Sequence, residues 1–163
     1  MTAAPQAASA AQSNTVRRTI AVAAPPETAF RVFTERMETW WPLESHHIGK
    51  APAAGLLMEP RPGGRWYERG ADGSTCDWGR VLAWEPPGRL VLSWEIDADW
   101  RPDPALHTEV EVRFVAEGPG RTRVELEHRL LDAYGARRDE MRETFGAAGG
   151  WRGLLQAFAA AAR

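Results

Sequence analysis

Hydrophobic and polar residues alternate along much of the chain, a period-two pattern that predicts a β-sheet. The first predicted strand covers residues 16–22, where Val16, Ile20 and Val22 fall on one face. Residues 56–129 contain further runs of this kind, separated by proline- and glycine-rich turn segments. The predicted strands there are Leu56–Glu59, Gly64–Arg69, Thr75–Trp84, Arg89–Ile96, Leu106–Glu117 and Arg121–Arg129. Because the segments between them are short, we expect an antiparallel meander.

Two segments instead repeat their hydrophobic residues with the period of an α-helix. After Pro25 and Pro26, a hydrophobic face indicates one helix or two short ones that end at Pro42; its residues are Phe30, Phe33, Met37, Trp40 and Trp41. The stretch Ala136–Arg163 lacks proline and carries a second stripe formed by Met141, Phe145, Trp151, Leu154, Leu155, Phe158 and Ala162. Gly149 and Gly150 weaken its middle. We therefore expect one bent helix, or a short helix that leads into a longer one.

The order of elements is strand, helix pair, six strands and long C-terminal helix, which predicts an α+β fold. The apolar face of a seven-stranded antiparallel sheet needs a cover, and the C-terminal stripe matches it. We expect a curved sheet around that helix, with the helix pair after the first strand. Strand phase places Thr108, Val110, Val112, Phe114, Val124, Leu126 and His128 on the inner face. Residues 1–14 are predicted to be a disordered lead, and 15–163 a single domain.

Composition excludes several classes of protein. The chain has 163 residues, a formal net charge of −2 and one cysteine. The charge does not suit a nucleic-acid-binding protein, and Cys76 alone cannot form an internal disulfide. No apolar run is long enough to span a membrane, and the N-terminal residues lack the pattern of a secretory signal. We expect a cytoplasmic protein without a cofactor, and its eight tryptophans are the most informative feature.

Several short stretches resemble the activators of the heat-shock-protein-90 ATPase, a family of the START-like (helix-grip) superfamily. The stretches are Pro26-Glu27 with Ala29-Phe30, Gly63-Gly64-Arg65-Trp66, Gly79-Arg80-Val81, Pro86–Leu90 leading to Trp94, Gly120–Val124, and Gly150-Trp151 with Leu154. Together they cover about residues 15–163. The resemblance implies a helix-grip fold. It also implies a function among those of the superfamily, whose members bind lipids, sterols, polyketides or hormones, catalyse reactions or assist chaperones.

The helix-grip arrangement predicts a cavity between the sheet and the C-terminal helix, where large flat side chains form walls for an apolar ligand. The expected wall residues are Trp40, Trp41, Trp66, Phe114, Met141, Phe145 and Trp151, with His46 and His128 as polar contacts. Trp100 lies in a proline-flanked loop, where it guards an entrance or contacts a partner. Strand phase does not decide which face Trp78 and Trp84 occupy. On the outer face they would form a patch for dimerisation or chaperone binding.

The sequence favours no catalytic or metal site. His46 and His47 are adjacent, so in an extended segment they point in opposite directions and cannot easily share a metal ion. Glu68 and Glu95 are the two acids able to face the interior and to serve as a general base. We expect non-catalytic binding of an apolar or amphipathic small molecule by a monomer or homodimer. The alternatives are a co-chaperone module acting by protein contact, and a cyclase- or hydrolase-like enzyme.

Overall fold

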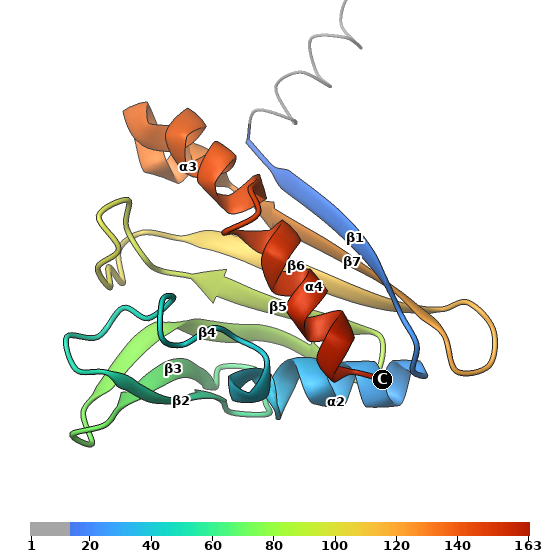
Figure 1. Cartoon of the computed structure of the whole chain (residues 1–163). Coiled ribbons are helices and arrows are strands. Elements are labelled where there is room, and N and C mark those ends of the chain that lie inside the picture. Colours follow the sequence, from blue (N-terminus) through green and yellow to red (C-terminus); the bar gives the residue numbers. More distant parts are fainter. Residues whose placement is uncertain (1–13) are drawn as a thin grey trace, which may run out of the picture.

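The computed structural model describes residues 14–163, which form a curved sheet with helices on its concave side (Figure 1). The expectation for residues 1–14 lies outside this range except for Asn14, whose backbone carbonyl and side chain accept hydrogen bonds from the N–H groups of Leu131 and Asp132. The strands are β1 (Val16–Val22), β2 (Ala53–Met58), β3 (Arg65–Gly70), β4 (Thr75–Glu85), β5 (Arg89–Trp94), β6 (Thr108–Ala116) and β7 (Thr122–Arg129). The predicted strands are thus all present, with ends shifted by a few residues.

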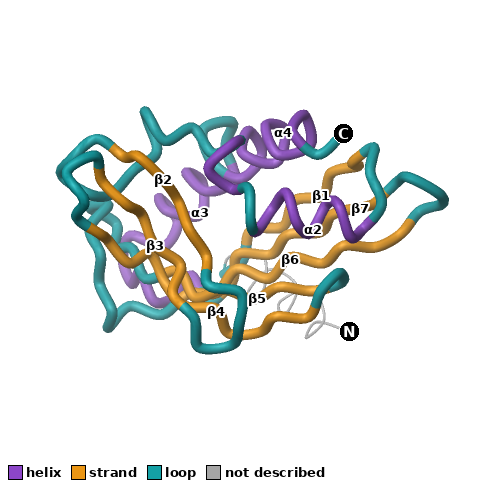
Figure 2. Tube along the Cα trace, turned by 90° about the horizontal axis from the view of Figure 1, so that it is seen from below, coloured by secondary structure: helices purple, strands orange, loops and turns teal. Residues whose placement is uncertain are grey.

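The seven strands form one antiparallel sheet in the order β1-β7-β6-β5-β4-β3-β2. The sheet bends at strand β4. Register shifts against β3 and against β5 each insert one extra residue into β4, at Trp78 and at Leu82. Such bulges bend a strand and increase its twist. As a result β2 and β3 turn steeply away from β6 and β7, and the sheet encloses a concave face (Figure 2).

The first helical segment consists of α2 (Pro26–Thr34) and the single 3-10 turn η1 (Met37–Thr39). The C-terminal segment begins with the 3-10 stretch η2 (Leu131–Arg137) and continues as α3 (Arg138–Gly146) and α4 (Trp151–Ala161). It is therefore a short helix leading into a longer one. Glycine makes the break possible: a Cβ on Gly153 would lie 1.9 Å from the carbonyl oxygen of Ala148, so only glycine fits there.

Alternation decides which side chains enter the core, as predicted. Every second residue from Thr108 to Phe114 in β6 and from Thr122 to His128 in β7 faces the helices and is buried. The outward residues form a ladder of cross-strand ion pairs, in which Arg129 contacts both Glu109 and Glu111. The helices complete the core with aromatic rings from α2 and α4. Within residues 14–163, no helix is long and apolar enough to cross a membrane.

Candidate ligand-binding site

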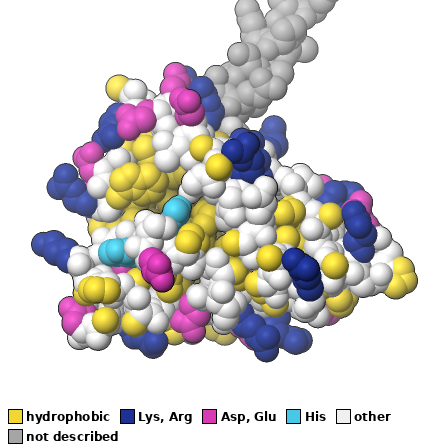
Figure 3. All heavy atoms as spheres, in the orientation of Figure 1, with side chains coloured by type: hydrophobic (Ala, Val, Ile, Leu, Met, Phe, Trp, Pro, Cys, Tyr) yellow, Lys and Arg dark blue, Asp and Glu magenta, His cyan; other side chains and the backbone are white. Residues whose placement is uncertain are grey.

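A cavity of about 600 Å³ opens between the loop after η1, strands β4 and β5, and the break between α3 and α4. Its volume lies within the range of small-molecule sites. Figure 3 shows histidine side chains beside a hollow where hydrophobic side chains are exposed. The residues that line the cavity are Trp41, Ser45, His46, His47, Ile48, Trp78, Trp94, Ile96, Trp100, Thr144, Phe145, Ala147, Gly149, Gly150, Trp151 and Leu154.

Four tryptophans of the lining form a closed circuit in which each indole contacts the next. We call this circuit the indole wall; its members are Trp41, Trp78, Trp94 and Trp151. The ring centroids lie 5.2 Å apart from Trp41 to Trp78 and 6.3 Å from Trp78 to Trp94. The circuit closes at 5.8 Å from Trp94 to Trp151 and 5.8 Å from Trp151 to Trp41. Tilted and edge-to-face contacts of this kind hold rings rigidly. The cavity therefore has a preformed aromatic wall.

The protein itself uses most of the polar edges of the indole wall. Trp41 Nε1 donates to the carbonyl of His46, and Trp78 Nε1 donates to the Glu68 carboxylate. Trp151 Nε1 donates to a histidine nitrogen described below. Trp94 Nε1 has no acceptor within residues 14–163. Because three of the four donors are engaged, the indole wall offers a ligand chiefly its apolar ring surfaces.

His128 lies behind the indole wall rather than in the cavity. It is fully buried at the end of β7 and accepts the Trp151 Nε1–H at Nδ1, 3.1 Å away. Its Nε2–H donates to Thr108 Oγ1 at 2.9 Å, and the Thr108 hydroxyl donates to the carbonyl of Trp94. This series of hydrogen bonds requires the neutral imidazole ring, because Nδ1 must accept a hydrogen bond. Burial agrees with this, since it lowers the pKa of His128 to about 3. The predicted interior position of His128 is confirmed. Its side chain holds the Trp151 ring in place through this hydrogen bond.

His46 connects the two sides of the cavity. Its Nε2–H donates to the carbonyl of Gly149 at 2.6 Å, and its Nδ1 accepts from the Ser45 hydroxyl at 2.7 Å. Gly149 belongs to the break between α3 and α4, whereas His46 follows η1, so the bond spans segments 103 residues apart. Both ring nitrogens are occupied. His46 therefore acts first as a tie between the loop and the helix break.

Of the nine predicted ligand contacts, four line the cavity and five do not. Trp41, His46, Phe145 and Trp151 are brought together there. His128, Trp40, Trp66, Phe114 and Met141 are buried in the packed core instead. Trp40, for example, packs against Phe158 and donates its N–H to a carbonyl of α2. Periodicity identifies inward-facing residues, but it does not show where the interior is filled and where it is open.

Sequence reasoning missed Trp94 and left Trp78 undecided, although both belong to the indole wall. Trp94 shares the inward phase of Leu90 and Leu92 on β5, so alternation was a usable signal. Trp78 gave none, because the bulges in β4 place inward residues at intervals of three: Trp78, Val81 and Trp84. Trp84 packs its ring against Phe30 of α2. Neither tryptophan forms the outer patch that a protein-contact function would use.

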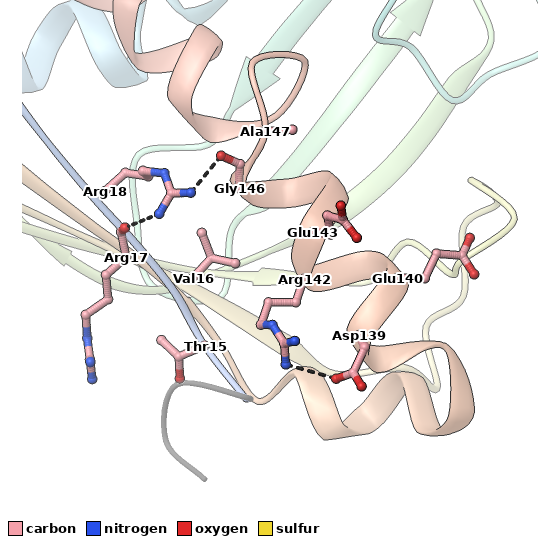
Figure 4. Close-up of a pocket in the computed structure, with 10 residues that line it drawn as sticks. All are labelled: Thr15, Val16, Arg17, Arg18, Asp139, Glu140, Arg142, Glu143, Gly146 and Ala147. Carbon is pink, nitrogen blue, oxygen red and sulfur yellow. Dashed lines mark hydrogen bonds and ion pairs between the residues drawn. The ribbon is translucent and has the colours of Figure 1, made fainter. Parts of the chain in front are cut away.

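A second hollow, of about 870 Å³, lies between the beginning of β1 and α3 (Figure 4). Its lining is charged: Arg17 and Arg18 come from β1, and Asp139, Glu140, Arg142 and Glu143 come from α3. Arg18 donates hydrogen bonds to the carbonyl of Gly146 and to that of Arg17, and Arg142 pairs with Asp139. This hollow is larger than the cavity, but none of the described residues that line it is aromatic. The aromatic cavity is the better candidate site.

Residues 23–163 match the family model described as activator of Hsp90 ATPase homologue 1-like protein. The chain belongs to this family. Its members share the helix-grip fold seen here, so the fold and the resemblance predicted from the sequence are confirmed. No curated protein matches the chain.

Several solved structures are similar to this chain over most of its length. An anthrahydroquino-γ-pyrone synthase complexed with SUM is 42% identical, with a TM-score of 0.64 and coverage of 90% of this chain and 96% of the other. The self-sacrificing resistance protein CalC from Micromonospora echinospora is 32% identical, with a TM-score of 0.68 and coverage of 92% and 94%. A protein from Nitrosomonas europaea, 17% identical with a TM-score of 0.64 and coverage of 91% and 93%, shares the fold.

Proposed function

We propose that this protein binds an apolar or amphipathic small molecule in the cavity bounded by the indole wall. The observation that carries the proposal is the cavity itself: about 600 Å³, walled by five tryptophans and Phe145, with His46 and His47 at its polar side. Apolar surface removed from water contributes roughly 25 cal/mol per Å². A rigid, preformed wall adds affinity because little side-chain freedom is lost on binding.

Two relatives that share at least 30% identity with this chain support a small-molecule function. One is named as a synthase and was solved in complex with SUM, and the other is named as a resistance protein. The synthase name also favours a second candidate, in which this chain catalyses ring closure of a bound polyketide-like compound. Mass spectrometry of a ligand recovered after incubation separates the two candidates, because simple binding returns the molecule unchanged.

Binding can be tested with 1-anilinonaphthalene-8-sulfonate and anthraquinones, which are flat and mostly apolar. Calorimetric titration of the wild-type protein is expected to show one site. The variant Ala147→Trp places a large ring at the cavity edge and should weaken binding at least about tenfold. Ala148→Trp is the matched control, since Ala148 is equally exposed but does not line the cavity. Equal affinities for both variants, or no binding to the wild type, would contradict the proposal.

Trp100 provides a second test, because its exposure and backbone geometry are unusual. The side chain is 43% exposed, lines the cavity and meets Phe145 edge-on at 6.2 Å. Its φ of 60° lies in the left-handed region, which costs a residue with a Cβ about 1–2 kcal/mol. The loop enforces this geometry through hydrogen bonds to Asp97 and an ion pair between Asp99 and Arg137.

Replacing Trp100 by Asn, which tolerates left-handed geometry, should separate binding from stability. We expect the free energy of unfolding of Trp100→Asn to stay within about 1 kcal/mol of wild type, because relief of strain offsets lost packing. Affinity for anthraquinones should fall about tenfold, the loss expected when one aromatic contact disappears. Urea denaturation and calorimetry measure the two quantities. Unchanged affinity would remove Trp100 from the binding surface.

A further inference from the structure

The two adjacent histidines of the cavity differ in what their rings leave available. His47 Nδ1 lies 3.0 Å from the carbonyl oxygen of Gly49. A carbonyl oxygen only accepts, so Nδ1 carries the hydrogen and Nε2 holds the lone pair of the neutral ring. Nε2 has no partner within residues 14–163, whereas both ring nitrogens of His46 are engaged. His47 lines the cavity with its side chain 30% exposed, so one basic nitrogen remains available there.

The buried carboxylate of Glu68 lies next to the His47 ring, on its Nδ1 side. Glu68 is 1% exposed and accepts hydrogen bonds from the N–H groups of Ile48 and Gly49 and from Trp78 Nε1. Three N–H donors converge on its two oxygens and fix the position of the carboxyl group. Its Oε2 lies 3.8 Å from His47 Nδ1, and no other cation pairs with Glu68 within the described part of the chain. The Glu68 carboxylate therefore lies on the Nδ1 side of the His47 ring, opposite the Nε2 that has no partner among residues 14–163.

The surrounding groups leave proton transfer to His47. The single cysteine, Cys76, pairs with Glu68 across β3 and β4. Burial, followed by the charge of Glu68, raises the pKa of its thiol to about 11, so it remains protonated. Glu68 itself does not line the cavity, and neither does Glu95. Ser45, the hydroxyl beside the histidines, already donates to His46. Of these groups, only His47 Nε2 combines basicity with access to a ligand.

We propose that His47 is the general base of this cavity, with Glu68 as a positioning residue, and that the ligand carries an acidic C–H or O–H group beside its apolar ring. This inference rests on the proposed cavity function. In the step, Nε2 takes the proton, the electron pair stays on the ligand as an enolate or phenolate, and the imidazolium is stabilised by Glu68 and the Gly49 carbonyl. The same nitrogen returns the proton to the product, so no oxidant or further reactant is needed.

A suitable probe is 5-nitrobenzisoxazole, a flat bicyclic compound with one acidic C–H bond. When a base takes that proton, the electron pair forms a C≡N bond, the N–O bond breaks and a coloured nitrophenolate appears. Tryptophan fluorescence quenching reports binding of the probe, and absorbance reports proton transfer. We expect the full-length protein to bind the probe and to accelerate its ring opening over the same concentration of free imidazole.

Three variants test which residues cause the acceleration of ring opening. His47→Gln should lower kcat at least about tenfold with little change in KM, since the base is lost and the wall is kept. Glu68→Gln should lower kcat by a smaller factor, again at nearly constant KM, because the imidazolium loses its counter-charge while a polar side chain remains. His107→Gln is the control, because His107 pairs with Glu109 at 2.7 Å but lies outside the cavity and should leave the rate within about twofold.

The outcomes distinguish this inference from the binding function on which it rests. Quenching with an acceleration that disappears in His47→Gln supports both. Quenching without acceleration, or with full acceleration in His47→Gln, overturns the role of His47 and leaves ligand binding intact. A rise in KM with unchanged kcat in the Glu68→Gln variant would reduce Glu68 to a structural residue. If the wild-type protein shows no quenching and no acceleration, both proposals are overturned.

Discussion

Acidification from pH 7 to pH 4 is expected to lower the free energy of unfolding by about 3 kcal/mol through His128 alone. In the folded protein, burial lowers the pKa of His128 from 6.5 to about 3. Between those values the unfolded chain binds a proton that the native core excludes, so acid favours unfolding by about 1.4 kcal/mol per pH unit. The stabilisation is complete above pH 6.5 and is lost progressively as the pH falls toward the folded pKa. Urea denaturation at several pH values measures it.

The matched variant is His128→Gln, which keeps a polar side chain but cannot titrate. It should be less stable than the wild type at pH 7, because the bonds to Trp151 and Thr108 are imperfectly replaced. That difference should shrink by about 3 kcal/mol at pH 4. Carboxylates such as Glu109 and Glu111 also titrate on acidification, but they do so in both proteins and cancel in the comparison. A difference independent of pH would show that His128 protonates readily in the folded state.

The substitution Gly79→Ala should destabilise the protein by about 3 kcal/mol or more, since small-to-large changes against backbone are the most costly form of overpacking. A Cβ at Gly79 would lie 1.9 Å from the carbonyl oxygen of Ser93 and 2.7 Å from its carbon. Backbone atoms cannot rotate away as a side chain can, so β4 and β5 would have to separate. Trp78 and Trp94 flank this contact, and the indole wall would move with them.

Gly88→Ala is the control for this change, because its added Cβ would meet nothing closer than 4.0 Å. Gly88 follows β4 at the turn into β5, so it samples the same hairpin without the close approach. We expect its unfolding midpoint in urea to stay close to that of wild type, whereas that of Gly79→Ala falls sharply. Affinity for anthraquinones should decrease only in Gly79→Ala. Equal midpoints would mean that β4 and β5 can separate without cost.

The candidate site was predictable only in part. The sequence placed the cavity against the C-terminal helix and identified Trp41, His46, Phe145 and Trp151, because each lies on an apolar helical face or beside its end. It did not identify Trp78, whose inward direction depends on bulges in β4. It selected His46 as the polar contact and passed over His47, since the difference between them arises from Gly149, Gly49 and Glu68, which are distant in sequence or dependent on loop shape.

Sequence patterns alone predict the order of the elements, the inner and outer faces of β6 and β7, and the helix-grip arrangement. These follow from local periodicity, because burying one apolar face of each element leaves few ways to assemble them. Where the interior is open depends on how the packed elements meet. Whether an inward ring such as Trp66 is packed or lines a cavity depends on side chains from three or four elements meeting at one point, and no periodicity within one segment encodes that meeting.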